Sequence, residues 1–126
     1  MNKTKAVVAI DGHNLRIEHV IAVSNFQADV HLDAGARQKI LKSRHYVEEL
    51  VAARRPVYGI TTGFGRFSDV FIEPQDTARL QQNLIHSHAC GVGELLPVED
   101  VRAMMLLRAN ALASGHSGVR LQVVEL

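Results

Sequence analysis

Apolar residues recur at intervals of three and four along three stretches of the chain, which is the spacing of one face of an α-helix. Asp33 precedes the first stretch and can accept hydrogen bonds from the free amides at a helix start, and Pro56 stops it. Pro74 suits the first turn of the second helix, and Gly115 ends the third. The predicted helices and their apolar faces are residues 34–55 (Ile40, Val47, Leu50, Val51), 73–90 (Leu80, Leu84, His88) and 97–113 (Val101, Met104, Met105, Leu112).

Shorter apolar runs lie outside these helices. The run AVVAI at residues 6–10 is rich in residues that favour a strand, and Asp11-Gly12 follows as a turn. A short helix is predicted over residues 15–23, and ADVHLD at 28–33 is predicted to be extended. The final VRLQVVEL begins another helix and carries no stop signal, so the sequence looks cut. We therefore predict a mainly α fold with one or two short strands.

Composition narrows the class of protein. A chain of 126 residues suits one modest domain, and 47% apolar with 21% charged residues argues against disorder and membrane spanning. The net charge is +1 and the charges are scattered, which argues against a nucleic-acid partner. The apolar run at residues 6–10 is too short for a signal peptide, so we expect a cytoplasmic protein. Cys90 is the single cysteine, and we expect a packed thiol.

Few polar residues on the helices point to chemistry. His86 and His88 form an HxH pair, which a helix directs to opposite sides, so we predict no metal site. His88 stays a candidate because it shares the apolar face with Leu84. Arg108 falls on the face of Val101 and Leu112, where a buried guanidinium would need a partner that the sequence does not name. Met104 and Met105 are expected to fill the core.

A glycine-rich segment, VYGITTGFG, lies between the first two long helices. Gly59, Gly63 and Gly65 predict a loop that can move. Tyr58 lies on this loop, and by spacing alone it would only cover a core with its hydroxyl in water. The GFGR segment lacks the full GxGxxG pattern and the Walker lysine, so we do not expect nucleotide binding.

Three blocks, YGITTGFG, LQQNLIHSHACGVG and LLRANALASGHSGVR, taken in this order and at these separations, resemble the N-terminal part of the histidine and aromatic amino acid ammonia-lyases. The resemblance covers nearly the whole chain. The SHACGVG block is more similar to the histidine enzymes, because the phenylalanine enzymes carry apolar residues where His88 stands. Thr61 departs from this pattern, since bacterial histidine enzymes usually have Asn there and phenylalanine enzymes have Thr. Substrate choice therefore stays open.

The resemblance implies elimination of ammonia from L-histidine to give trans-urocanate. It implies an electrophilic methylidene-imidazolone (MIO) ring, made from an internal Ala-Ser-Gly, that captures the substrate amine. Tyr58 matches the tyrosine that removes the β-proton, a role that needs surroundings favouring phenolate because a free phenol titrates near ~10. His88 matches the residue placed against the substrate ring. The resemblance also implies a larger helical-bundle lyase that assembles as a homotetramer.

The segment Ala113-Ser114-Gly115 contains the residue types of the MIO precursor. In the resembling family the precursor lies in a later block similar to GSVGASGDL, and LASGHSGVR matches a helix end. A helix end offers no evident compression to drive ring closure. We therefore expect the MIO to form from a triad downstream of residue 126, and residues 1–126 to be a single N-terminal fragment that is inactive alone.

Two alternatives remain. A tyrosine or phenylalanine ammonia-lyase or an aminomutase would share the Tyr58 loop and differ at the ring pocket, where His88 argues against phenylalanine more than against tyrosine. A non-catalytic helical module would bind a partner through its apolar C-terminal residues, which would otherwise be exposed.

Overall fold

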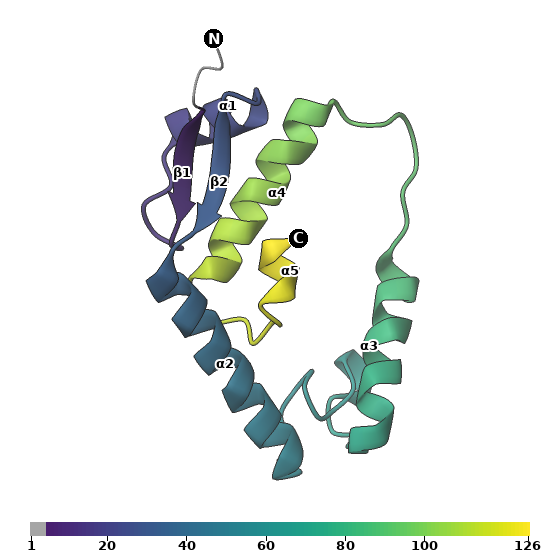
Figure 1. Ribbon diagram of the computed structural model, residues 1–126. Helices are drawn as coiled ribbons and strands as arrows, with labels where there is room; N and C mark the ends of the chain where they lie inside the picture. The colour runs from purple at the N-terminus through teal and green to yellow at the C-terminus, as the bar shows by residue number, and fades with distance from the viewer. Residues whose placement is uncertain (1–4) are drawn as a thin grey trace. The chain divides into compact units, whose positions relative to one another are not determined.

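The computed structural model describes residues 5–126, which divide into two compact units. One unit comprises Met1–Arg44 and Leu95–Leu126, and the other comprises His45–Glu94. Helices dominate both, and the two strands are short, so the prediction of a mainly α fold is confirmed (Figure 1). The described residues contain no helix that is long and apolar enough to cross a membrane.

The first unit contains a small parallel sheet. Strands β1 (Ala6–Ile10) and β2 (Ala28–Leu32) pair in register from Ala6 opposite Ala28 to Ile10 opposite Leu32. Parallel strands need a crossover connection, and α1 (Ile17–Ser24) supplies it. Both strands and the short helix were predicted from the sequence, whereas their pairing was not.

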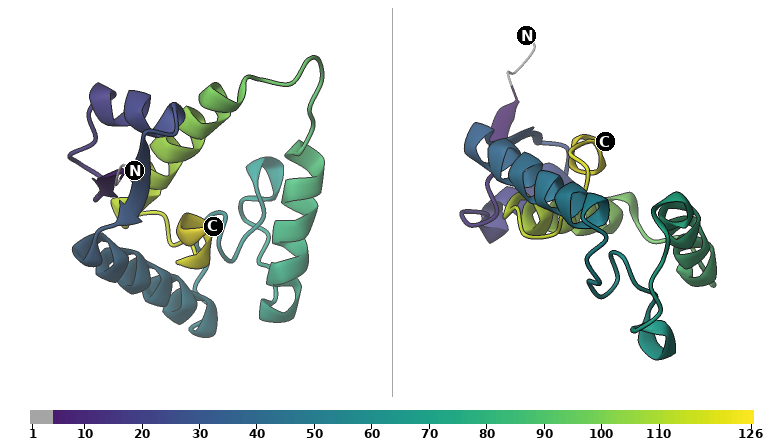
Figure 2. Two further views of the ribbon diagram at one scale, coloured as in Figure 1. Left: turned by 45° about the horizontal axis from the view of Figure 1, so that its top comes forward. Right: turned by 90° about the horizontal axis from the view of Figure 1, so that it is seen from below.

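Helix α4 (Val98–Ala113) packs against α1 and completes this core (Figure 2). Apolar side chains from both strands and both helices are buried together. Burial of such side chains stabilises the unit because each removes apolar surface from water. The fully buried members of this cluster are Val8, Ile10, Val23, Ala28 and Leu106.

The arginine of α4 that is partly buried and has a carbonyl partner is Arg102, not Arg108. Arg102 donates from Nε and Nη2 to the carbonyl oxygen of Val23, at 3.0 and 2.9 Å. Its guanidinium carbon also lies 4.0 Å from the centre of the Phe26 ring. Arg108 is exposed, so the arginine that the sequence suggested for the apolar face of α4 lies on a different face of the helix from the one that is packed.

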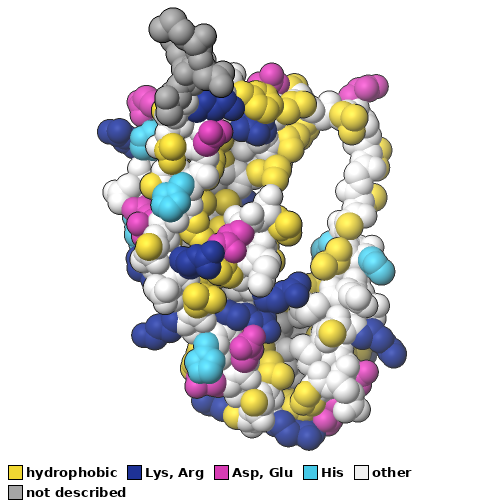
Figure 3. Space-filling model, in the orientation of Figure 1, with side chains coloured by type: hydrophobic (Ala, Val, Ile, Leu, Met, Phe, Trp, Pro, Cys, Tyr) yellow, Lys and Arg dark blue, Asp and Glu magenta, His cyan; other side chains and the backbone are white. Residues whose placement is uncertain are grey.

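Met104 and Met105 do not fill the core. Both are more than half exposed, and hydrophobic side chains are visible along α4 at the surface (Figure 3). Of the predicted apolar face Leu112 is buried, and the other buried positions of the helix are Leu106 and Ala113. Apolar residues occur on several sides of this helix, so periodicity alone did not identify the face that is buried here.

The turn after β1 joins this core to the end of α4. The Asp11 carboxylate accepts hydrogen bonds from the backbone amides of His13 and Asn14, each at 2.8 Å. Chiefly these bonds lower the pKa of Asp11 from 3.8 to about 2, because they stabilise the charged form. The amide of Gly12, the residue after Asp11, donates to Oδ1 of Asn110 on α4 at 3.1 Å.

Helix α2 (Ala34–Ala52) begins in the first unit, and its residues from His45 onward belong to the second. Asp33 accepts a hydrogen bond from the amide of Ala36 at 3.0 Å, which confirms the predicted cap. The helix ends three residues earlier than the predicted Arg55. A left-handed residue, Arg54 at φ 51°, ends it rather than Pro56.

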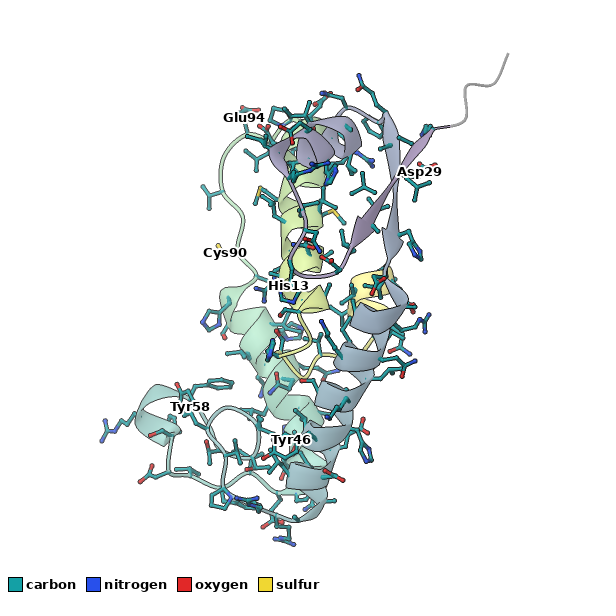
Figure 4. All side chains as sticks on the ribbon, turned by 90° about the vertical axis from the view of Figure 1, so that its left-hand side faces the viewer. His13, Asp29, Tyr46, Tyr58, Cys90 and Glu94 are labelled. Atoms are coloured by element: carbon teal, nitrogen blue, oxygen red, sulfur yellow. The ribbon has the colours of Figure 1, made fainter. Side chains whose placement is uncertain are left out.

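The rest of the chain follows the predicted order. Helix α3 (Pro74–His88) has proline in its first turn, as predicted, and it lies in the second unit with a short 3-10 helix, η1 (Gly65–Phe67). A final short helix, α5 (Gln122–Glu125), follows α4 in the first unit. Cys90 lies on the segment after α3 and is exposed, so the expectation of a packed thiol was wrong (Figure 4).

Candidate functional site

The candidate site is the loop of residues 55–72 in the second unit, whose two ends are held together by side chains. Arg54 ends α2, and its guanidinium donates to both carboxylate oxygens of Glu73, at 2.8 and 2.6 Å. Glu73 is the residue before α3. The guanidinium carbon of Arg54 also lies 5.6 Å from the centre of the Phe71 ring. The Arg54–Glu73 pair therefore holds the two ends of the loop together, and we call this pair the neck of the loop.

Backbone hydrogen bonds close the loop above this neck. Thr62 and Phe71 form an antiparallel bridge. The amide of Ile72 donates to the carbonyl oxygen of Thr61 at 2.8 Å. The amide of Gly63 donates to the carbonyl oxygen of Val70 at 3.1 Å. Because residues near its two ends pair with each other, this segment is a closed loop rather than an extended linker.

Two consecutive buried threonines hold the turn that carries Tyr58. The Thr61 hydroxyl accepts a hydrogen bond from the amide of Val57 at 2.8 Å and donates to the carbonyl of Arg55. The Thr62 hydroxyl accepts from the amide of Gly59 at 3.3 Å. The backbone amides immediately before and after Tyr58 are thus both bound by threonine hydroxyls. Such short polar side chains commonly stabilise turns in this way.

Tyr58 itself is on the outside of this turn. Its side chain is 62% exposed, and Figure 4 shows it near the short η1 segment. The ring meets that of Phe64 edge-to-face, with centres 5.9 Å apart, and the Tyr58 hydroxyl accepts a long hydrogen bond from the amide of Gly65 at 3.4 Å. The phenol is therefore presented at the surface of a hydrogen-bonded loop.

The three loop glycines are required by geometry. Gly59 has φ of 70°, and a Cβ there would lie 2.9 Å from the Phe64 ring. Gly63 is buried, and a Cβ there would lie 2.8 Å from the carbonyl oxygen of Phe67. Gly65 has φ of 54°. Their predicted role in loop movement stays a prediction.

His88 is the last residue of α3 and is exposed. Its Nδ1 lies 3.0 Å from the carbonyl oxygen of Leu84 and 2.9 Å from Oγ of Ser87. A carbonyl oxygen only accepts, so the contact with Leu84 is a hydrogen bond in the tautomer that carries the proton on Nδ1. In the neutral imidazole this leaves Nε2 as an acceptor.

The predicted residues Tyr58 and His88 belong to the same unit but their hydrogen bonds remain local. Tyr58 contacts its own loop, and His88 contacts its own helix. Within residues 5–126 no cluster of three or more His, Cys, Asp or Glu side chains could hold a metal ion.

The helix end at Ala113-Ser114-Gly115 lies in the other unit and has ordinary capping geometry. Gly115 has φ of 79°, and its amide donates to the carbonyl oxygen of Leu112 at 3.0 Å. The Ser114 hydroxyl donates to the carbonyl oxygen of Ala111 at 2.8 Å. Ala113 is fully buried. MIO formation needs the glycine nitrogen to attack the alanine carbonyl, and here that amide is bound to the helix instead. These residues do not fit the precursor of the ring.

Comparison with known proteins places the chain among enzymes. Residues 15–126 match the family model described as aromatic amino acid lyase. The chain belongs to the aromatic amino acid lyase family. This confirms the resemblance that was stated from the three sequence blocks.

Curated relatives narrow the likeness within this lyase family. The chain is 57% identical over 118 residues to histidine ammonia-lyase of Caldanaerobacter subterraneus and 52% identical over 119 residues to histidine ammonia-lyase 2 of Fusobacterium nucleatum. Each match covers 94% of this chain and 23% of the relative. The chain thus spans about a quarter of the length of these curated relatives.

Solved structures of lyases and aminomutases share this fold. Histidine ammonia-lyase from Trypanosoma cruzi is 38% identical with a TM-score of 0.85, covering 94% of this chain and 23% of that one. Tyrosine aminomutase from Streptomyces globisporus is 37% identical with a TM-score of 0.88, covering 95% and 23%. The structural likeness therefore extends to enzymes of both kinds.

The residues that build the loop around Tyr58 were not predicted from the sequence. Thr61 was a departure from a family pattern there, and Arg54 was expected inside a helix. The signal for the threonines was present, because two adjacent hydroxyl side chains in a glycine-rich segment can satisfy backbone groups of a turn. The Arg54 and Glu73 pair had no local signal, since the two residues are 19 positions apart.

Proposed function

We propose that this chain is the N-terminal part of a histidine ammonia-lyase, which eliminates ammonia from L-histidine to give trans-urocanate. The observation that carries the proposal is Tyr58, presented on a closed loop in a chain 57% identical to a histidine ammonia-lyase. Because the chain spans about a quarter of its relatives, the activity belongs to the longer enzyme.

In this proposal Tyr58 is the general base. The phenolate oxygen takes the proton from Cβ of the substrate, and the electron pair of that C–H bond forms the new double bond as the C–N bond breaks. A general base must reach the proton that it removes, and Tyr58 is exposed at the surface of its loop. We also propose that the glycines of the loop let it close over the substrate and exclude water.

His88 is proposed to bind the imidazole of the substrate. With Nδ1 donating to Leu84, Nε2 of the neutral ring is an acceptor that suits the N–H of an imidazole. A phenyl ring carries no such donor, so this contact would favour histidine over phenylalanine.

The family's MIO ring supplies an electrophile that makes the substrate amine a better leaving group. Ala113-Ser114-Gly115 is engaged in a capped helix end, so we propose that the ring forms from another Ala-Ser-Gly, downstream of residue 126. Residues 1–126 would then be inactive alone. By the same resemblance we propose a cytoplasmic homotetramer acting on a free amino acid.

The substitution Tyr58→Phe in the full-length lyase tests the base. General bases contribute about 10²- to 10⁴-fold to rate, so we expect kcat for histidine to fall by at least about 100-fold with KM little changed. Steady-state kinetics followed by urocanate formation would measure this. Tyr46→Phe is the matched control, because the chain has two tyrosines and Tyr46 is similarly exposed on α2. A Tyr58→Phe enzyme with near wild-type kcat would refute the assignment.

A tyrosine ammonia-lyase or aminomutase is the second candidate, favoured by the 0.88 TM-score to the Streptomyces globisporus aminomutase. Both candidates would use Tyr58 in the same way. Product analysis separates them, since a tyrosine-specific enzyme would leave histidine unchanged and convert tyrosine.

A further inference from the structure

Two threonines that no substrate can reach in this structure hold the backbone on both sides of Tyr58. Thr61 is 1% exposed and Thr62 is 3% exposed, whereas Tyr58 is 62% exposed. Their hydroxyls bind the amides of Val57 and Gly59 respectively. The position of the phenol is therefore set from the buried side of the loop.

Thr61 uses both kinds of hydrogen-bonding capacity that its side chain has. It accepts from the Val57 amide at 2.8 Å and donates to the Arg55 carbonyl, so it ties the start of the loop to the turn. The backbone of Thr61 also binds the far end of the loop, because its carbonyl accepts from the amide of Ile72 at 2.8 Å. One residue thus joins the entry, the turn and the exit of the loop that carries Tyr58.

We propose that Thr61 is a positioning residue for Tyr58 and that its side chain does not select the substrate. This inference rests on the proposed role of Tyr58 as the base. A side chain that carries a donor and an acceptor close to the backbone satisfies both Val57 and Arg55, and Asn meets that requirement as Thr does. Thr or Asn at position 61 therefore carries no information about whether histidine or tyrosine is the substrate.

The removal of the hydroxyl tests the positioning role. Thr61→Val keeps the shape but leaves the Val57 amide and the Arg55 carbonyl without this partner, so the turn shifts. Small misplacements of a catalytic group cost up to about 100-fold in rate, and we expect kcat for histidine to fall about 10- to 100-fold with KM little changed. Thr61→Ser keeps the hydroxyl and is expected to retain kcat within about threefold.

A kinetic isotope effect distinguishes positioning from general damage. With histidine deuterated at Cβ, Thr61→Val should increase the isotope effect on kcat, because a displaced base slows proton removal specifically. A variant that merely loses folded enzyme would lower the apparent kcat and leave the isotope effect as in wild type. Thr77→Val is the matched control, because Thr77 is a half-buried threonine whose hydroxyl binds the Glu73 carbonyl within the same unit. It should leave both quantities unchanged.

The double variant Tyr58→Phe with Thr61→Val shows whether Thr61 acts through Tyr58. If it does, the double variant has the same kcat as Tyr58→Phe alone, because there is no base left to misplace. If Thr61→Val lowered kcat by the same factor in the wild-type enzyme and in the Tyr58→Phe enzyme, the proposal would be overturned. A Tyr58→Phe enzyme that remains active would instead overturn the proposed function, so the two failures are distinguishable.

Thr61→Asn tests the second half of the proposal and still decides it if Thr61→Val fails to fold. We expect the ratio of kcat/KM for histidine to that for tyrosine to stay within about threefold of wild type, since both side chains can make the two bonds. A change of preferred substrate in Thr61→Asn would show that residue 61 contacts the substrate and would overturn the inference.

Discussion

At the scale of single residues, His88 shows how a local hydrogen bond prepares a side chain for a partner. The contact of Nδ1 with the Leu84 carbonyl favours the tautomer protonated on Nδ1, and the protonation of one ring nitrogen determines what the other can do. Ser87 lies 2.9 Å from the same nitrogen and further restricts the ring. The orientation of this imidazole is therefore set by its own helix.

The substitution His88→Phe in the full-length lyase tests this residue. Loss of a hydrogen bond to a polar group in a dry site costs about 1–3 kcal/mol, so kcat/KM for histidine should fall about 10- to 100-fold while activity on tyrosine or phenylalanine holds or rises. His86→Phe, two positions earlier on the same helix, is the control and should keep the preference for histidine. Unchanged selectivity in His88→Phe would remove it from the ring pocket.

Two arginines of α4 have similar sequence surroundings and different environments in the structure. Arg102 is bound to the Val23 carbonyl and stacked on Phe26, whereas Arg108 is exposed. Both lie on α4 at positions flanked by apolar residues, so spacing could not separate them. The partner that decides between them is a carbonyl 79 residues away in sequence.

At the scale of elements, close approaches of backbone fix how the helices of the first unit pack. A Cβ at Gly12 would lie 2.6 Å from the backbone nitrogen of Ser114, and one at Gly115 would lie 2.5 Å from Cβ of Lys39. The end of α4 is thus in contact with the turn after β1 and with α2. Only glycine permits both approaches.

The substitution Gly115→Ala should loosen this junction. The residue has φ of 79°, where an L side chain costs roughly 1–2 kcal/mol, and its Cβ would also overlap Lys39. We expect faster amide hydrogen exchange at the end of α4 and in the first turns of α2, and a lower unfolding temperature of the full-length lyase. Exchange is the primary measurement because large enzymes seldom unfold in one step.

Gly91→Ala is the control for this prediction. A Cβ at Gly91 would meet no atom within 4 Å, and its φ is not in the left-handed region. Surface changes of this kind are usually within about 0.5 kcal/mol. Equal exchange rates for Gly115→Ala and wild type would mean that the helix end accommodates a side chain despite the short distance to Lys39.

At the scale of the whole molecule, the chain covers 23% of the length of its curated relatives. It carries the proposed base and the proposed ring contact on one unit and an Ala-Ser-Gly sequence on the other. The bonds of Gly115 and Ser114 to their own helix argue that this triad is part of the scaffold. This geometry supports the proposal that other residues of the complete enzyme supply the electrophile.

The substitution Ser114→Ala tests the source of the electrophile. If the triad is scaffold, the full-length variant retains kcat within about threefold, since only exposed contacts of the hydroxyl, with the Ala111 carbonyl and with Nδ1 of His116, are lost. Mass spectrometry of the peptide that contains residues 113–115 in the wild-type enzyme should give its unmodified mass. A peptide that has lost water, together with an inactive variant, would place the ring here.

The sequence alone was sufficient for the order of helices and strands, the cap at Asp33, the stop at Gly115 and the membership of a lyase family. Each of these depends on residues that are near one another along the chain, where propensity, capping and motif order act directly. Local pattern also brought Tyr58 and His88 to attention, and their catalytic and binding roles remain proposals.

Tertiary structure decided what the local pattern left ambiguous. In the folded chain Leu106 is buried, whereas Met104 and Met105 are exposed. Arg102 rather than Arg108 binds a backbone carbonyl, that of Val23. Helix α2 ends at Ala52, earlier than predicted. The tertiary structure also revealed that Thr61 and Thr62 bind the backbone on both sides of Tyr58. Burial and pairing depend on which surfaces meet in space, and residues distant in sequence determine that choice.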